Sequence, residues 1–194
     1  MTSHISTTTL SGADQSFSGT LTGASTLGNL SFTGSGTKTF ANNASTSNFI
    51  VSASSTVVTP TALSISGNYH NDGTLTTTGN TTYLTGSNPQ SLSGTTTFNN
   101  LYLKNNSRTG TTTFNSALTV GDTFTADGST YIGLLSGATS TIANLTLNGS
   151  STAPISFGST ATGTKSNLIV SGSTVVTYTR VQDSSACGSN GGDY

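Results

Sequence analysis

The sequence repeats a short unit in which large apolar residues alternate with polar ones. Residues 28–34, GNLSFTG, form the first copy, in which Leu30 and Phe32 are separated by one polar residue and enclosed by turn-forming residues. Similar units begin at residues 47, 61, 99, 116, 143 and 166. Apolar residues at a spacing of two indicate a β-strand with one buried face. Because Thr, Ser, Asn and Gly dominate the remaining positions, the chain is predicted to be all-β.

The spacing of these units predicts a parallel β-solenoid. The steps between unit starts are 19, 14, 38, 17, 27 and 23 residues, and the longest step is expected to contain one degenerate copy. The units then follow coils of about 20 residues. The segments 95–99 and 111–115, both TTTFN, predict further short strands within each coil. We predict one solenoid domain over residues 1–186 and a flexible tail over 187–194. An antiparallel β-sandwich is the alternative, since turn signals at this spacing also suit that fold.

The composition agrees with a stack of coils. Charged residues make up 6% of the chain, none is Glu, and the net charge is -1. A coil of about 20 residues cannot bury its own apolar pair, but coils stacked ~4.8 Å apart bury a continuous inner column. Like charges at stacked positions would repel at that distance, whereas stacked Asn residues can form side-chain ladders at turns. A stacked fold therefore explains why Ser, Thr, Asn and Gly replace charged residues.

The charge and hydropathy patterns exclude two classes of partner. The five basic residues are spread thinly, so they give no electrostatic footprint for nucleic acid. No apolar run approaches the ~18 residues of a transmembrane helix, so we expect no insertion into a membrane. The first residues, MTSH, do not form a signal peptide. We expect that a native signal was removed or that the chain is an excised fragment.

Reactive residues do not cluster in the sequence, so we predict no enzyme, no cofactor and no metal. Of the six aspartates only Asp122 and Asp127 are close, and a spacing of five on a continuous strand sends them to opposite faces. His70 is expected in a solvent-facing turn. Residues 190–193, NGGD, resemble a single calcium-type turn without the repeated array such sites need. Cys187 is the lone cysteine and is expected to be a free thiol.

A binding role is the main functional alternative. Exposed tyrosines on a Thr- and Asn-rich face are candidate stacking platforms for a glycan, and there are four of them: Tyr69, Tyr83, Tyr102 and Tyr131. Tyr102 lies between Leu101 and Leu103 and should therefore point outward. Repeated Thr-x-Thr pairs allow an ice-binding face, although the steps between pairs range from 12 to 39 residues. This irregular spacing does not favour a single flat column.

Two segments carry a family resemblance. Residues 62–79, ALSISGNYHNDGTLTTTG, and 90–103, QSLSGTTTFNNLYL, resemble the repeats of large bacterial secreted or surface β-helix proteins. Residues 175–186 look like a recurrent coil of such adhesin-like proteins. The resemblance implies a right-handed parallel β-helix, export and surface display, and it transfers no catalytic residue.

The repeats and the lack of clustered chemistry predict a structural role outside the cell. We expect a surface stalk, an adhesin segment or a self-assembling filament subunit. The sequence shows no helical or charged cap at either end of the stack, so we expect end-to-end self-association. A surface glycan is the other partner we consider, together with the ice-binding alternative.

Overall fold

The computed structural model confirms a parallel β-solenoid. It describes residues 6–23, 26–104 and 111–186, and within them the chain makes about eight turns of about 22 residues, with no helix. Every strand pair in these residues is parallel, so the alternative of an antiparallel sandwich is wrong. The tail predicted over 187–194, with Cys187 and the turn at 190–193, lies outside the described residues.

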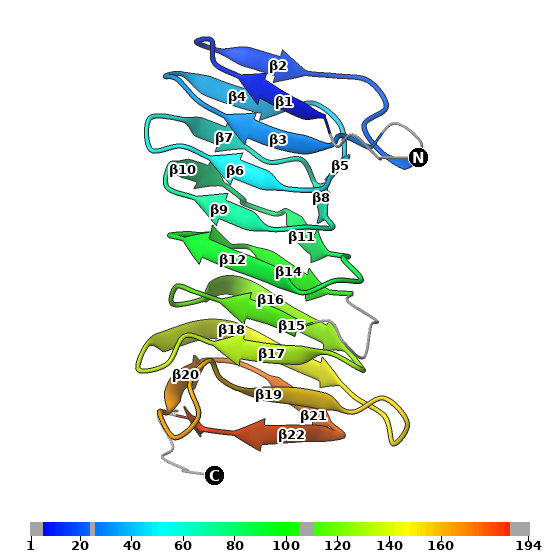
Figure 1. Ribbon diagram of the computed structural model, residues 1–194, viewed down its shortest axis with the longest axis vertical. Coiled ribbons are helices and arrows are strands. Elements are labelled where there is room, and N and C mark those ends of the chain that lie inside the picture. The colour runs from blue at the N-terminus through cyan, green and yellow to red at the C-terminus, as the bar shows by residue number, and fades with distance from the viewer. Residues whose placement is uncertain (1–5, 24–25, 105–110, 187–194) are drawn as a thin grey trace.

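The strands stack into three sheets, the first of which runs the length of the described stack (Figure 1). The first sheet has nine strands: β1 (Thr7–Leu10), β3 (Asn29–Phe32), β6 (Phe49–Val51), β9 (Tyr69–Asn71), β12 (Gln90–Gly94), β15 (Thr111–Phe114), β17 (Tyr131–Leu134), β19 (Ile155–Ser159) and β22 (Thr179–Gln182). The second has four: β2 (Gln15–Phe17), β4 (Thr37–Phe40), β7 (Thr56–Val58) and β10 (Thr74–Thr76). At ~4.8 Å per strand, the nine strands of the first sheet form a stack about 38 Å tall.

The third sheet changes along the stack. It contains β5 (Ala44–Thr46), β8 (Ala62–Ile65), β11 (Thr81–Leu84), β14 (Asn100–Leu103), β16 (Thr119–Asp127), β18 (Thr139–Asn148), β20 (Ser166–Val170) and β23 (Ser184–Ala186). Two further strands pair at its side: β13 (Thr97–Phe98) with β16, and β21 (Thr174–Thr177) with β18. The long strands β16 and β18 each pair with two strands of a neighbouring turn, so they extend across a corner of the coil.

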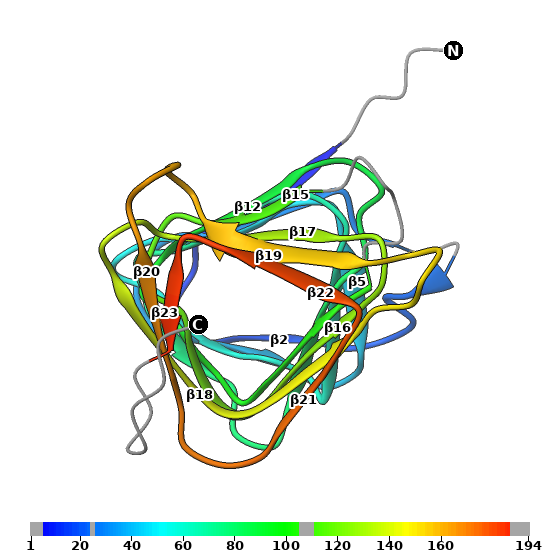
Figure 2. The ribbon, with the colours of Figure 1, turned by 90° about the horizontal axis from the view of Figure 1, so that it is seen from below.

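Figure 2 shows the coils as a triangle around a common axis. In this view from the C-terminal end, β18, β19 and β20 follow one another anticlockwise as the chain approaches the viewer. The winding is therefore right-handed, which is the hand that parallel crossovers adopt in nearly all proteins.

The seven apolar units do not occupy equivalent positions in the coil. Those beginning at 28 and 47 lie in the first sheet, on β3 and β6, whereas the other five lie in the third sheet. The short step of 14 arises because β6 and β8 are two faces of the same turn. The degenerate copy predicted in the long step exists: β11 stacks between β8 and β14, with Thr82 aligned with Leu63 and Leu101.

Inward-facing residues form one continuous core. On the first sheet Leu30, Phe49, Tyr69, Leu92 and Phe114 follow one another in register, and each is at most 4% exposed. Rings in the N-terminal half contact from coil to coil, with centroids 5.2 Å apart for Phe32 and Phe49 and 5.8 Å apart for Phe49 and Tyr69. Each coil thus buries the apolar residues of the coil before it, as the sequence predicted.

A ladder of amide side chains follows one corner of the stack. Asn48 donates to the side chain of Asn29 at 2.6 Å, and the Asn48 oxygen accepts the backbone N–H of Asn68 at 2.6 Å. The Asn68 oxygen accepts the backbone N–H of Ser91 at 2.9 Å, and Asn115 donates to the Ser91 hydroxyl at 2.7 Å. The predicted Asn ladder is confirmed over three coils, and Ser91 and Asn115 continue the hydrogen bonds over the next two. It satisfies backbone donors at a corner where the sheets end.

One cation lies inside the core. Lys38 on β4 is fully buried, between Gln15 and Val57 of the adjacent strands. Its ammonium donates to the carbonyl oxygens of Gly34, Ser35 and Gly36 at 3.3, 2.6 and 3.3 Å. Lysine carries three donors, so these carbonyls satisfy the group that burial would otherwise leave without partners.

Two inward-facing threonines provide a test of this packing. Thr112 is fully buried, and its hydroxyl has no partner among the described residues. The Thr112→Val substitution keeps the shape and removes an unsatisfied hydroxyl, so it should raise the free energy of unfolding by about 1 kcal/mol. The measurement is urea denaturation followed by circular dichroism.

Thr46 is the matched control for this substitution. It is equally buried, but its hydroxyl lies 2.6 Å from the Gly28 carbonyl oxygen and 3.0 Å from that of Asn48. Thr46→Val should therefore lower the free energy of unfolding by about 1 kcal/mol. Changes of the same sign in the two variants would contradict the hydrogen-bond assignment.

Candidate functional site

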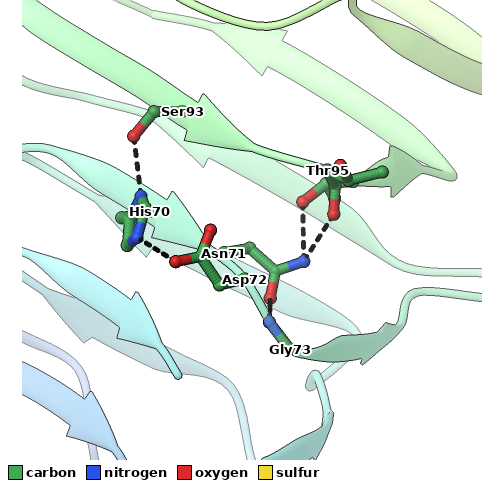
Figure 3. Close-up of polar contacts among 7 residues, drawn as sticks. His70, Asn71, Asp72, Gly73, Ser93 and Thr95 are labelled. Carbon is green, nitrogen blue, oxygen red and sulfur yellow. Dashed lines mark hydrogen bonds and ion pairs between the residues drawn. The ribbon is translucent and has the colours of Figure 1, made fainter. Parts of the chain in front are cut away.

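The structure brings a serine from the next coil to a histidine and an aspartate that are close together in the sequence (Figure 3). His70 lies on β9, and Ser93 is its register partner on β12 in the next coil. The Nδ1 atom of His70 is 2.8 Å from the Ser93 hydroxyl, and its Nε2 atom is 2.9 Å from an Asp72 carboxylate oxygen. His70 was expected in a turn, but it lies in a strand and projects to solvent at its corner. Sequence reasoning missed Ser93, because the pairing depends on the register between coils.

This arrangement resembles a Ser–His–Asp triad in composition but not in geometry. In serine hydrolases the carboxylate holds Nδ1 and the serine faces Nε2, whereas here the two nitrogens have exchanged partners. The side chains of His70 and Asp72 are 43% and 56% exposed, so water screens their interaction. The nearby Thr95 N–H is already bonded to the Asn71 carbonyl and is not available to an oxyanion.

The residues beside His70 hold the corner of the coil. Asn71 is buried and donates to the Thr95 carbonyl at 2.7 Å, while its own side-chain oxygen accepts the Gly73 N–H at 3.1 Å (Figure 3). Gly94 has a φ of 84°, and a Cβ there would lie 1.9 Å from the Asn71 carbonyl oxygen. Only glycine fits this close approach. The contacts around His70 therefore join two coils at a tight corner.

The four candidate tyrosines divide into buried and exposed residues. Tyr69 is 2% exposed and hydrogen-bonds through its hydroxyl to Thr96, so its prediction as a stacking platform is wrong. Tyr69 occupies the inward position that Phe49 occupies in the preceding coil. Burial raises the pKa of the Tyr69 hydroxyl. Tyr102 points outward between the buried Leu101 and Leu103, as predicted. Tyr131 is 43% exposed on the first sheet.

Tyr83 and Tyr102 form one cluster on the outer face of the third sheet. Their ring centroids are 5.7 Å apart, and the Lys104 ammonium lies 5.1 and 4.8 Å from them. The Tyr102 hydroxyl donates to Asp127, which also accepts from Asn148 at 3.3 Å. The hydrogen bond to Asp127 is the main cause that raises the pKa of Tyr102 to about 12. Because cation–π contacts occupy these rings, the cluster is largely satisfied within the chain.

The sequence predicted that Asp122 and Asp127 lie on opposite faces of the strand, and this prediction is wrong. The register of β16 shifts between Val120 and Thr123, and both aspartates reach the outer side, Asp122 exposed and Asp127 half-buried. Residues 121–123 all lie on the outer side at this irregularity, which interrupts the alternation on which the prediction depended. Asp122 contacts Thr123 at 3.2 Å and Asn144 at 3.4 Å, so the two carboxylates serve separate contacts.

The Thr-x-Thr pairs lie on different sheets. Residues 37 and 39 belong to β4 of the second sheet, 111 and 113 to β15 of the first, and 123 and 125 to β16 of the third. These pairs therefore do not form one flat array. The ice-binding alternative loses the single surface that it needs.

The last described coil leaves its core side open. Val176 and Val181 are the register partners of the buried Leu147 and Phe157, yet they are 46% and 55% exposed. Their neighbour Tyr178, at the corner between β21 and β22, is 64% exposed and has a φ of 42°. No coil among residues 6–23, 26–104 and 111–186 covers these inward-facing valines, so they form an exposed apolar end of the described stack.

We compared the chain with known protein families, curated proteins and solved structures. No family model, curated protein or solved structure matches the chain. Among the described residues no three His, Cys, Asp or Glu side chains gather to hold a metal ion, and no helix is long and apolar enough to span a membrane. The fold defines the protein as a parallel β-helix repeat protein.

The Tyr102 contact predicts a defined alkaline transition. Tyr102 has a pKa of about 12 in the folded state and of 10 in the unfolded chain. The neutral phenol therefore adds to the free energy of unfolding below pH 10. That stability should be lost as the pH rises from 10 to about 12. Asp127→Asn removes the charge that favours the neutral phenol, so the Tyr102 transition should move towards pH 10.

Ultraviolet absorbance of tyrosinate measures this transition, and Tyr102→Phe identifies it. Thermal unfolding between pH 9 and 12 measures the accompanying loss of stability. An Asp127→Asn titration that superimposes on the wild-type curve would show that Asp127 does not set this pKa.

Proposed function

We propose that this protein is an extracellular structural element, a rigid segment of a surface stalk, adhesin or filament that extends by head-to-tail pairing of copies. The observation that carries the proposal is the open apolar end formed by Val176 and Val181. An uncovered coil end presents both apolar side chains and unpaired strand groups, and a second coil satisfies both.

The two ends of the described stack are compatible with each other. The first sheet ends in β1 on one side and β22 on the other, and both strands run in the same direction along the coil. Each end strand carries an inward-facing apolar residue, Leu10 on β1 and Val181 on β22, so stacking β1 of one copy on β22 of another would cover apolar side chains of both strands. Such pairing repeats a single operation, so it generates an open fibre and not a closed ring.

The charge distribution does not oppose this pairing. The whole chain carries a net charge of -1, and the inward-facing residues Leu10 and Val181 of the two end strands are apolar. Copies can therefore approach end to end without the repulsion that limits association of highly charged proteins. The extracellular setting is supported by the resemblance of residues 62–79 and 90–103 to secreted and surface β-helix repeats.

A charge at the open end should block assembly. Val181→Lys places an ammonium where the next coil would bury it, so end-to-end association should weaken by roughly tenfold or more. Sedimentation velocity over a concentration series measures this effect, and negative-stain microscopy shows whether fibres form. The wild-type chain should form oligomers that lengthen with concentration.

Ile50→Lys is the matched control for this variant. Ile50 is 37% exposed on the outer face of β6, away from both ends, so its substitution should leave assembly unchanged. The proposal fails if the wild-type chain stays monomeric at high concentration, or if both lysine variants weaken assembly equally.

The structural role includes no catalysis by Ser93. A fluorophosphonate probe reacts with activated serines, and the reversed, exposed triad should leave Ser93 unmodified because no strong base or oxyanion site supports attack. Intact mass spectrometry measures the labelling. Stoichiometric labelling that Ser93→Ala abolishes would instead assign the molecule hydrolase chemistry.

A further inference from the structure

Tyr131 lies between two hollows on the outer face of the first sheet. One hollow, of about 230 Å³, extends towards the C-terminal end and is lined by Ser156, Arg180, Gln182 and Asp183. The other, of about 320 Å³, lies on the opposite side and is lined by Ser129 and Pro154. Tyr131 and Ser156 border both hollows. The two hollows therefore form one elongated groove with Tyr131 at its centre.

The Tyr131 ring leans along the sheet and leaves part of its surface open. A Cβ at Gly133 would lie 3.4 Å from the Cε1 atom of Tyr131, and the Tyr131 hydroxyl donates to the Ser159 carbonyl at 3.3 Å. The ring is therefore held over a glycine by one hydrogen bond. The side chain is still 43% exposed, unlike the Tyr83 and Tyr102 rings that Lys104 covers.

The groove also supplies charged and polar groups beside the ring. Arg180 is exposed, and its guanidinium has no hydrogen-bond or ion-pair partner among the described residues. Asp183 is held in place by the Gly163 N–H at 3.1 Å and by Gln182 at 3.4 Å. A free guanidinium can bind a carboxylate in a bidentate manner, while amide and hydroxyl groups can bind sugar hydroxyls.

We propose that this groove binds an oligosaccharide that contains a carboxylate-bearing sugar. Tyr131 stacks against the apolar face of one sugar ring, and Arg180 binds the carboxylate of the neighbouring unit. The groove is elongated and presents polar and apolar surface in similar amounts, which suits the hydroxyl groups and the apolar ring faces of a sugar chain. Arg180 faces outward and its neighbour Val181 faces inward, so the groove and the proposed end-to-end contact share β22 but use different faces of it.

Tri-galacturonate is the probe for this proposal, and its methyl ester is the neutral counterpart. Isothermal titration should show saturable binding of the acid at millimolar concentration and weaker binding of the ester. Tyr131→Ala should weaken binding of both by about tenfold, because it removes the stacking surface, and Tyr131→Trp should retain it. Arg180→Gln should remove the preference for the acid while leaving binding of the ester unchanged.

Tyr102→Ala is the matched control, since it removes an outward-facing tyrosine of another sheet. Circular dichroism and the thermal midpoint establish that each variant is folded. The proposal is overturned if the acid shows no saturable binding up to about 10 mM. A dissociation constant above that concentration corresponds to a binding free energy weaker than about -3 kcal/mol. It is also overturned if Tyr102→Ala weakens binding as much as Tyr131→Ala, or if the acid and the ester bind equally to the wild-type chain.

Discussion

Parallel stacking in register is the constraint on which this structure depends. A single coil has no interior of its own, so its inward residues are buried only when another coil lies above and below. Leu30, Phe49 and Tyr69 illustrate this, because each occupies the same inward position one coil after the other. Backbone hydrogen bonds and apolar burial thus depend on the same spacing of ~4.8 Å. The interior coils satisfy both requirements, whereas the last described coil leaves Val176 and Val181 exposed.

The same spacing governs which polar residues the stack tolerates. Identical positions in successive coils lie close enough to interact directly, so residues that bond to their own kind are favoured. Asn29, Asn48 and Asn68 form such a ladder, whereas the buried cation Lys38 is held by carbonyl oxygens of a single turn. The low charge of the chain and the hydrogen-bonded corners therefore have one physical origin.

The sequence predicted what local alternation controls and failed where register between coils decides. The strand units and the degenerate copy at β11 could be predicted because a spacing of two is a local property. Tyr69 was misplaced although a signal was present: the pair Asn68-Tyr69 follows Asn48-Phe49 by one coil, which marks Tyr69 as inward. Asp122 and Asp127 share the outer face because the register of β16 shifts between Val120 and Thr123, which the residue pattern did not predict. The contact between His70 and Ser93 likewise depends on the length of the intervening coil.

Coil length also explains where a binding groove can form. In the N-terminal half the first sheet advances by short coils, since Leu30 pairs with Phe49 and Phe49 with Tyr69. Near the groove Tyr131 pairs with Ser156, and Ser156 with Arg180, so these coils carry several additional residues. Some of these residues lie in the loops between β18 and β19 and between β19 and β20, which project from the triangle (Figure 2). Stacking fixes the faces, while the corners are free to lengthen, so a groove beside Tyr131 requires no change in the core.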